Sequence, residues 1–293
     1  MNKLKLKKRL QYIAFLLPAG FPLVLFWIYP IVRTIHLSFT DWDYMTPEYN
    51  YVGLQNYGSM LSDEAFYEAL KVTIWFGFGT VLPTIILGML LALLIQQLGK
   101  GSTFYKALIF SPWITPTVAV AIVWTWIYEP DTGVANMLLQ WLGFEGSAWI
   151  HSSQTALLSV IIMTVWKNAG YAMLFYIGAL GRVPEELYEA AAIDGSGKIK
   201  KFFGITLPLV SPTTLLLMIM LTIQSLQAYD QIQVLTQGGP SGSTRTLLYR
   251  YYQLAFEQFN MGEASANVVA LLILTVLLSV LQLWVSKRYV HYQ

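Results

Sequence analysis

A polar stretch interrupts the apolar sequence at Glu189-Ala190-Ala191-Ala192-Ile193-Asp194-Gly195, and Ile205-Thr206-Leu207-Pro208 follows after nine residues. Local signals predict a short helix here. Pro184 suits a first helical position, because proline lacks the N–H that would stay unpaired there. Glu185 and Glu186 stabilise the positive end of the helix dipole. The alanines are strong helix formers, and Asp194-Gly195 is expected to end the helix, since glycine accepts a positive φ.

One face of this predicted helix carries small side chains. By their i, i+3, i+4, i+7 spacing, the members of that face are Leu187, Ala190, Ala191 and Asp194. Two alanines would let the backbone of a partner protein come close. The helix is therefore interpreted in two ways: as a surface pressed against a soluble motor protein, or as an amphipathic connector resting on lipid headgroups.

The composition limits the class of protein. Of the 293 residues, 56% are hydrophobic and only 12% are charged, whereas a soluble domain averages about 25% charged. The mean hydropathy is +0.53, and together these values predict a polytopic membrane protein. The net charge of +2 is too small to indicate a nucleic-acid partner. The absence of cysteine excludes disulfides and thiolate metal sites.

Long apolar runs predict the number of membrane crossings. Spanning a bilayer takes about 20 predominantly apolar residues. Six runs reach that length, at residues 12–38, 70–98, 105–128, 155–180, 207–235 and 264–285. The expected fold is an all-α membrane protein with a transmembrane domain over 12–288, between an N-terminal segment at 1–11 and a tail at 289–293. The connection 181–206 holds the predicted surface helix and joins the fourth and fifth spans.

Basic residues predict the side of the membrane on which each loop lies. If the N-terminus is cytoplasmic, thirteen of the 18 Lys and Arg residues fall in inner segments and three fall in outer loops. Lys and Arg concentrate on the cytoplasmic side of membrane proteins. Both termini and the 181–206 connection are therefore expected in the cytoplasm.

Two spans carry polar stripes. The fourth has Thr164, Lys167, Asn168 and Tyr171, and the fifth has Gln224, Gln227 and Gln231, with Ser225 and Asp230 beside them. Polar residues inside spans are functional candidates. A lining of amides, hydroxyls and rings such as Trp166 and Tyr171 would suit a neutral, hydroxyl-rich solute. The alternative is interhelical hydrogen bonding that only holds the bundle together, at about 0.6 kcal/mol per contact.

The sequence carries no recognisable catalytic pattern. Gly195-Ser196-Gly197-Lys198 looks like part of a phosphate-binding loop, but Ala192 and Ile199 stand where that motif needs Gly and Ser or Thr. No HExxH or GxSxG pattern is present. We therefore expect no enzymatic activity, no metal and no cofactor bound by this chain.

The polar stretch resembles a family motif. Glu189-Ala190-Ala191-x-x-Asp194-Gly195, nine residues, then Ile205-x-Leu207-Pro208, is similar to the EAA motif of binding-protein-dependent ABC importer permeases, with no insertion. Further stretches resemble the carbohydrate branch of that family: Ser38-Phe39-Thr40, residues 52–57, residues 130–136 and Gly238-Gly239-Pro240. The resemblance runs nearly end to end and looks most like the smaller maltose-type permeases.

The resemblance implies a type I ABC importer permease fold in a bacterial or archaeal cell membrane. It also implies partners: a second homologous permease, two ATPase subunits that hold ATP and Mg, and an extracytoplasmic sugar-binding protein. Each ATPase would take one coupling helix in a surface cleft. ATP binding would then switch the spans from inward- to outward-facing. The residues implied in coupling are Glu189, Ala190, Ala191, Asp194, Gly195, Leu207 and Pro208. By the same resemblance, Glu189 makes the polar contact, the two alanines pack closely, and Gly195 forms the turn.

Other functions remain open at this point. An ion- or proton-coupled carrier would work alone, but the predicted spans hold few ionisable groups away from their ends, among them Arg33, Lys167 and Asp230. Proton relays usually show chains of Asp, Glu or His. A scaffold or receptor would not need the prolines and polar stripes of the spans. A glycerol phosphate would want a more basic lining than Lys167 alone, so a neutral sugar is the expected solute.

Overall fold

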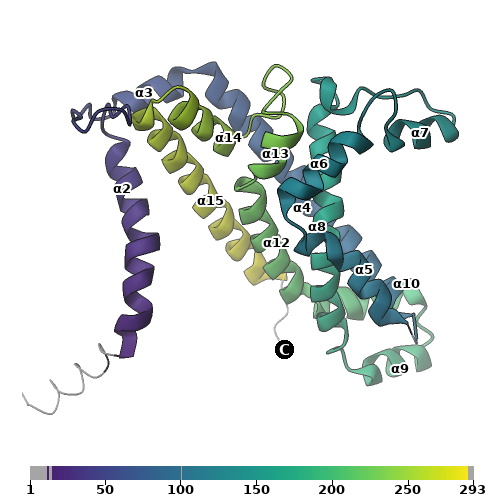
Figure 1. Ribbon diagram of the computed structural model, residues 1–293. Helices are drawn as coiled ribbons and strands as arrows, with labels where there is room; N and C mark the ends of the chain where they lie inside the picture. Colours follow the sequence, from purple (N-terminus) through teal and green to yellow (C-terminus); the bar gives the residue numbers. More distant parts are fainter. Residues whose placement is uncertain (1–11, 13–14, 100, 290–293) are drawn as a thin grey trace, which may run out of the picture. The chain divides into compact units, whose positions relative to one another are not determined.

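The computed structural model describes residues 12, 15–99 and 101–289 (Figure 1). The N-terminal segment 1–11 with its five basic residues, Lys100, and residues 290–293 of the predicted tail lie outside the described residues. The helices are η1 (Val24–Ile28), α2 (Tyr29–Leu37), α3 (Gln55–Ser62), α4 (Glu64–Gln96), α5 (Ser102–Ile114), α6 (Thr117–Ile127), α7 (Val134–Trp141), η2 (Trp149–His151), α8 (Ala156–Leu180), α9 (Glu185–Ile193), α10 (Lys198–Lys201), η3 (Phe202–Thr206), α11 (Leu207–Leu209), α12 (Ser211–Leu226), α13 (Asp230–Leu235), α14 (Leu247–Tyr252), η4 (Gln253–Glu257) and α15 (Met261–Tyr289).

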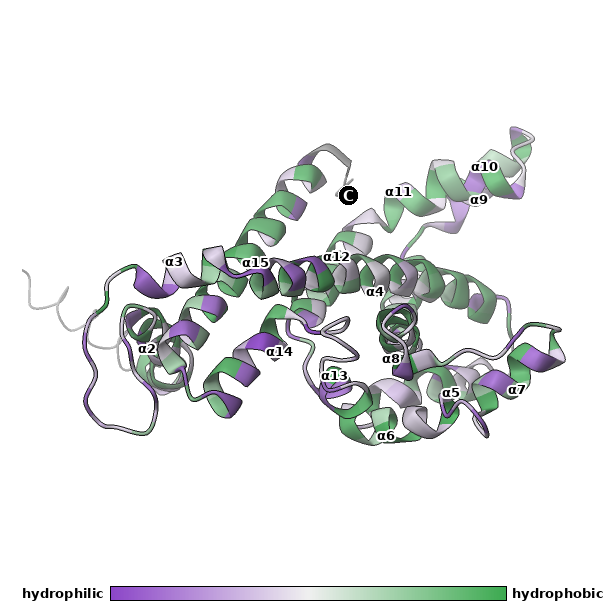
Figure 2. Cartoon of the chain, turned by 90° about the horizontal axis from the view of Figure 1, so that it is seen from above, coloured by the Kyte–Doolittle hydropathy of each residue, from purple (hydrophilic) through white to green (hydrophobic). Residues whose placement is uncertain are grey.

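Several helices are long and apolar enough to cross a membrane. Within the described residues, four do so alone: Phe15–Leu37, Glu64–Gln96, Ala156–Leu180 and Met261–Lys287. Two bent helix pairs pass the same test, so the count is up to six if each pair is one span. Figure 2 shows these helices as mostly hydrophobic, with hydrophilic residues gathered in connecting segments such as α9. The prediction of an all-α, multi-pass membrane protein is confirmed, and the count of six spans stays a prediction.

The chain divides into two compact units, and unit 1 joins the residues up to Asp63 to Tyr251–Ala270. Its core contains Leu37, Leu254, Ala255, Met261 and Ala264, all buried. The Asn56 amide donates hydrogen bonds to the carbonyls of Ser38 (2.9 Å) and Thr40 (2.8 Å). Two of the stretches that carry the family resemblance, 38–40 and 52–57, are therefore in contact within this unit.

Unit 2 contains Glu64–Arg250 and the residues from Leu271 onward. Its central pair is α4 and α8, which pack through small residues. A Cβ on Gly88 of α4 would lie 2.5 Å from the Cβ of Ala172 on α8. Spans approach closely through such small residues, because lipid offers no hydrophobic drive for association. Met173 and Tyr176 of α8 are fully buried in this contact region, and the Tyr176 hydroxyl donates to Thr214 Oγ1 of α12 at 3.0 Å.

The third predicted span, 105–128, is a broken helix. The axis turns by 98° between α5 and α6. Pro116 offers no backbone N–H to continue α5, and the residue before a proline is driven to extended geometry. Thr115 has φ −70° and ψ 136°, in agreement with that constraint. Two proline-flanked helices therefore replace the straight span.

The fifth predicted span, 207–235, differs from the structure at both ends. A bent pair runs from Lys198 to Leu209 and from Ser211 to Leu226, with a 63° angle between its parts. The helix ends at Leu226, and α13 begins only at Asp230. The expectation of one helical stripe through Gln224, Gln227 and Gln231 is therefore wrong: Gln227 caps α12, and Gln231 belongs to α13.

A glycine substitution on α8 tests the packing of the broken span. A Cβ on Gly170 would lie 2.1 Å from the carbonyl oxygen of Ile109 on α5. Overpacking of this kind costs about 1–3 kcal/mol, so we expect Gly170→Ala to lower the thermal unfolding midpoint of the purified protein. Gly178→Ala on the same helix meets no atom within 4 Å and is the matched control. Equal midpoints for the two variants would contradict this packing.

Candidate functional site

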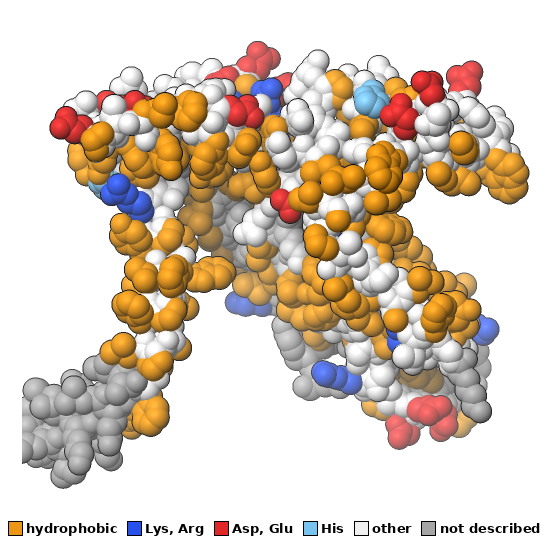
Figure 3. All heavy atoms as spheres, viewed as in Figure 1, with side chains coloured by type: hydrophobic (Ala, Val, Ile, Leu, Met, Phe, Trp, Pro, Cys, Tyr) orange, Lys and Arg blue, Asp and Glu red, His pale blue; other side chains and the backbone are white. Residues whose placement is uncertain are grey.

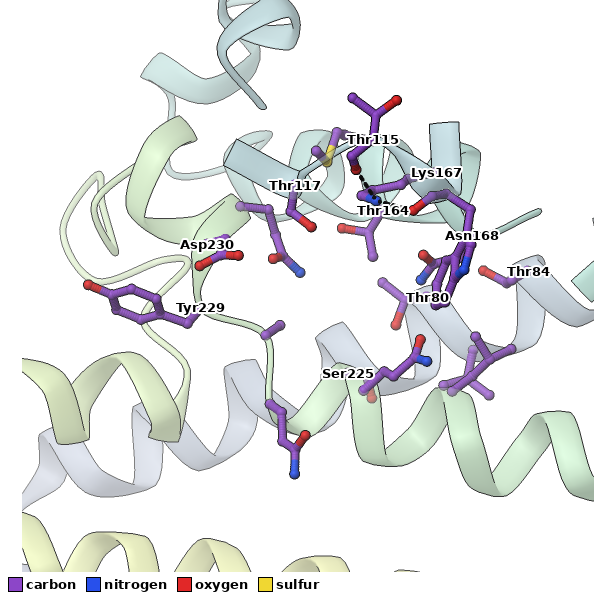
Figure 4. Close-up of a pocket in the computed structure, with 18 of the residues that line it drawn as sticks. Thr80, Thr84, Thr115, Thr117, Thr164, Lys167, Asn168, Ser225, Tyr229 and Asp230 are labelled. Carbon is purple, nitrogen blue, oxygen red and sulfur yellow. Dashed lines mark hydrogen bonds between the residues drawn. The ribbon is translucent and has the colours of Figure 1, made fainter. Parts of the chain in front are cut away.

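Unit 2 contains a cavity of about 490 Å³ between its spans (Figure 4). Its walls come from α4, the break between α5 and α6, α8, the end of α12 and the start of α13. Trp113, Thr115 and Thr117 lie at the 98° turn between α5 and α6, and all three line this cavity. The volume falls within the range of about 300–1,000 Å³ that is typical of small-molecule sites.

The lining mixes polar and apolar side chains and is almost uncharged. It contains the hydroxyls of Thr80, Thr84, Thr115, Thr117, Thr164 and Ser225, and the amides of Asn168, Gln224, Gln227 and Gln231. Lys167 and Asp230 are the only lining residues of the acidic or basic type. Hydroxyls and amides both donate and accept hydrogen bonds, so the surface can match a solute that does the same.

Most residues of the two predicted stripes meet at this cavity. Thr164, Lys167 and Asn168 line it from α8, while Gln224, Ser225, Gln227, Asp230 and Gln231 line it from α12, α13 and their connection. The second group reaches the cavity through the break after Leu226 and not through helical periodicity. Tyr171, the last member of the first stripe, does not line the cavity.

Lys167 is buried, at 7% exposure, and all three of its donors point at the break in the third span. Its Nζ donates to the carbonyl oxygens of Pro112 (3.1 Å), Trp113 (3.2 Å) and Thr115 (3.0 Å). The last carbonyls of a helix have no partner within that helix. Lys167 therefore holds the end of α5, and it also lies 5.6 Å from the centre of the Trp113 ring.

The aromatic residues that line the cavity are Trp113 and Tyr229, and neither belongs to the predicted polar stripes. Trp113 stacks on Tyr171 with ring centres 4.2 Å apart, and the Tyr171 hydroxyl donates to Met220 Sδ at 3.4 Å. The expectation that Tyr171 and Trp166 would offer rings to a solute is not supported by their positions. Trp166 belongs to a separate apolar groove, where it contacts Trp124 at 5.5 Å. The sequence feature that could have identified Trp113 as a cavity residue is its position between two prolines, Pro112 and Pro116, at the break of the helix.

The predicted surface helix is α9. It runs over Glu185–Ile193, with Pro184 as its N-terminal cap and Asp194 as its C-terminal cap, and Gly195 follows. The N–H groups of Gly195 and Ser196 donate to the carbonyls of Ala192 (3.0 Å) and Ala191 (2.9 Å). Gly195 has φ +71°, a value that a side chain would strain. The local prediction for this helix is therefore confirmed, with the start one residue later than expected.

The side chains implied in coupling lie open on α9. Glu189, Ala190, Asp194 and Gly195 are exposed, and Ala191 is half-buried. The Tyr188 hydroxyl is hydrogen-bonded to Thr206 Oγ1 at 2.9 Å, directly before Leu207 and Pro208 at the start of α11. This bond ties the exposed helix to the fifth span.

Comparison with known proteins now places the chain in a family. A family model described as "Binding-protein-dependent transport system inner membrane component" matches residues 84–291. The chain is 34% identical over 273 residues to the probable ABC transporter permease protein YurN of Bacillus subtilis, covering 92% of this chain and 93% of YurN. It is 34% identical over 262 residues to the trehalose/maltose transport system permease protein MalF of Thermococcus litoralis, covering 89% and 88%.

The fold is also found in a solved structure. A chain of a bacterial ABC transporter that imports the acidic polysaccharide alginate superposes with a TM-score of 0.81 over 97% of each chain, at 22% sequence identity. At that identity the likeness establishes the fold alone. The relatives by sequence establish more: this chain belongs to the family of binding-protein-dependent transport system inner membrane components, as a multi-pass permease of an ABC transporter.

Proposed function

We propose that this chain forms half of the pathway by which a neutral sugar or oligosaccharide enters the cell. The observation that carries the proposal is the cavity lined by hydroxyls, amides and the Trp113 ring. Sugars present hydroxyls that donate and accept, and C–H faces that pack on aromatic rings. The relative from Thermococcus litoralis, whose name assigns it trehalose and maltose, supports a solute of this class.

The charge of the cavity favours a neutral solute over a phosphorylated one. Lys167 is the one Lys or Arg side chain in the lining, and its three N–H donors are already directed to backbone carbonyls. Asp230 adds a negative charge at the other side of the space (Figure 4). A glycerol phosphate would therefore meet little free positive charge.

The exposed helix α9 supports coupling to a separate ATPase. Its Glu189, Ala190 and Gly195 are accessible to a partner. A displacement of α9 would pass through the Tyr188–Thr206 hydrogen bond into the fifth span, whose far end contributes Gln224 and Ser225 to the cavity. The proposed assembly has a second homologous permease, two ATPase subunits that bind ATP and Mg, and an extracytoplasmic binding protein that delivers the sugar.

The assembly is tested by purification and reconstitution together. The tagged chain, extracted in mild detergent from its native membrane, should carry a second permease and an ATPase. In liposomes the complex should hydrolyse ATP faster when the binding protein and its sugar are added.

Glu189→Lys and Gly195→Pro should lower sugar uptake by roughly tenfold or more, since about 1.4 kcal/mol at an interface is a factor of ten, while the protein stays in the membrane.

Glu145→Lys makes the same charge reversal at an exposed position far along the chain from α9 and is the matched control. It should leave uptake unchanged. Full uptake by both α9 variants would contradict the coupling role. A chain that purifies alone and moves solute without ATP would replace the importer with a carrier.

A second prediction concerns Lys167. We expect Lys167→Met to leave the three carbonyls of the break without a partner, at a cost of about 1–3 kcal/mol, and so to lower the unfolding midpoint and sugar uptake together. Gln224→Met removes a polar group from the same cavity without touching the break, and it should change the midpoint far less. If Lys167→Met kept full stability and lost only the uptake of a phosphorylated solute, Lys167 would be an anion receptor and the neutral-sugar proposal would be wrong.

A further inference from the structure

The short helix α7 packs on unit 2 through a polar residue. Asn136 is buried, and its Nδ2 donates to the carbonyls of Pro130 (2.8 Å) and Ser147 (2.9 Å). Its Oδ1 accepts from the backbone N–H of Ser147 (2.9 Å) and from Trp149 Nε1 (2.8 Å). These four bonds use the hydrogen-bonding capacity of the amide, so the inward face of α7 is fixed by polar contacts.

The connection from α6 fixes the direction of α7 as well. Gly133 donates its N–H to the Glu129 carbonyl at 2.8 Å, and a Cβ there would lie 2.3 Å from that oxygen and 2.5 Å from the Ile127 carbonyl. The chain can make this tight turn only with glycine. The helix is therefore attached to the end of α6 at a defined angle and is not a loose segment of loop.

The outward face of α7 is apolar, the reverse of a helix on a water-exposed surface. The large side chains Met137 and Leu138 are each 56% exposed, and Trp141 is 82% exposed. The strip is completed by Val134, Leu142 and Phe144, which are also exposed. By helical geometry Val134, Met137, Leu138 and Trp141 lie on the side opposite Asn136, since residues three and four apart share a face.

The surroundings of this strip identify what covers it. The strip adjoins α6, whose side chains Ile122, Val123 and Trp126 are also exposed and apolar. Together with α5, α6 forms a bent pair that is apolar enough to cross a membrane. The segment between α6 and α8, which carries α7, is called the arm here (residues 129–151). Figure 3 shows hydrophobic side chains along the lower edge of this arm and acidic side chains along its upper edge. No Lys or Arg occurs in the sequence between Lys106 and Lys167, so attraction to anionic headgroups is not what holds the arm.

We propose that α7 lies in the plane of the membrane interface, with its apolar strip inserted into the lipid leaflet on the side opposite α9. A helix with one apolar face and one polar face lies in the plane of the interface with its apolar face among the acyl chains, and Trp141 is of the type that settles at the headgroup level. The helix would then brace the outer end of α6, and with it the break that shapes the cavity.

The chain contains no cysteine, so a single introduced cysteine carries one spin label. We would label Leu138→Cys and Trp141→Cys on the strip, with Gln140→Cys on the polar side of the same helix as the matched control. Ile122→Cys supplies the lipid reference and Asp131→Cys the water reference. The complete transporter, reconstituted in liposomes, is then probed by EPR for collision with oxygen, which is concentrated in lipid, and with a nickel chelate, which is confined to water. The unsubstituted chain in the same complex reports any label on partner subunits.

The proposal predicts an oxygen-to-nickel collision ratio at positions 138 and 141 that is several-fold above that at Gln140→Cys and equal to that at Ile122→Cys. Ratios that match Asp131→Cys would overturn it, because the strip would face water. Labels shielded from both reagents, with or without the binding protein, would overturn it as well, because a protein would cover the strip. The readout does not depend on transport, so its failure would leave the proposed function untouched.

Discussion

Backbone groups inside a bilayer must find their hydrogen-bond partners within the protein, since no water is present to replace them. The third span breaks at Thr115-Pro116 and exposes carbonyls in that setting, and Lys167 of α8 supplies three donors to them. The break turns the chain by 98° and directs Trp113, Thr115 and Thr117 into the cavity. The buried Lys167 ammonium group therefore stabilises the break that shapes the cavity. Because its three N–H groups are bonded to backbone carbonyls, few of its donors are left for a solute.

The cavity and the surface helix are linked through the two spans that carry the polar residues. The fourth span, α8, lines the cavity with Thr164 and Asn168 and ends at Leu180, directly before α9. The fifth span begins beyond α9, is bonded to it through Tyr188 and Thr206, and lines the cavity from its far end. α9 is therefore connected to the polar cavity through α8 on one side and through the Tyr188–Thr206 bond on the other, and the proposed coupling would use these two connections.

Local rules made α9 predictable, because its proline, alanines and glycine act within a few residues. Periodicity correctly grouped Thr164, Lys167 and Asn168, since α8 is regular over its length. The same reasoning failed where helices stop: Gln227 and Gln231 share the cavity because α12 ends at Leu226, not because they share a helix face. The third span was predicted as one continuous helix, and the bend at Thr115-Pro116 depends on tertiary contacts such as those of Lys167. The place of Trp113 at the cavity was therefore missed, and Tyr171 and Trp166 were expected there instead. The apolar face of α7 follows the i, i+3, i+4, i+7 spacing of Val134, Met137, Leu138 and Trp141, but that it points outward depends on the contacts of Asn136 with residues 130–149.

We propose that the sugar occupies the cavity at the break, and the most direct test is the alkylation rate of Thr117→Cys in the complete transporter. Thr117 is a half-buried lining residue, and Ser102→Cys, half-buried at the start of α5 and outside the cavity, is the control. With the binding protein, ATP and a saturating sugar present, labelling at position 117 should slow while labelling at position 102 does not change. If position 117 reacted at the same rate with and without sugar while uptake was saturated, the solute would take another path and the account would be wrong.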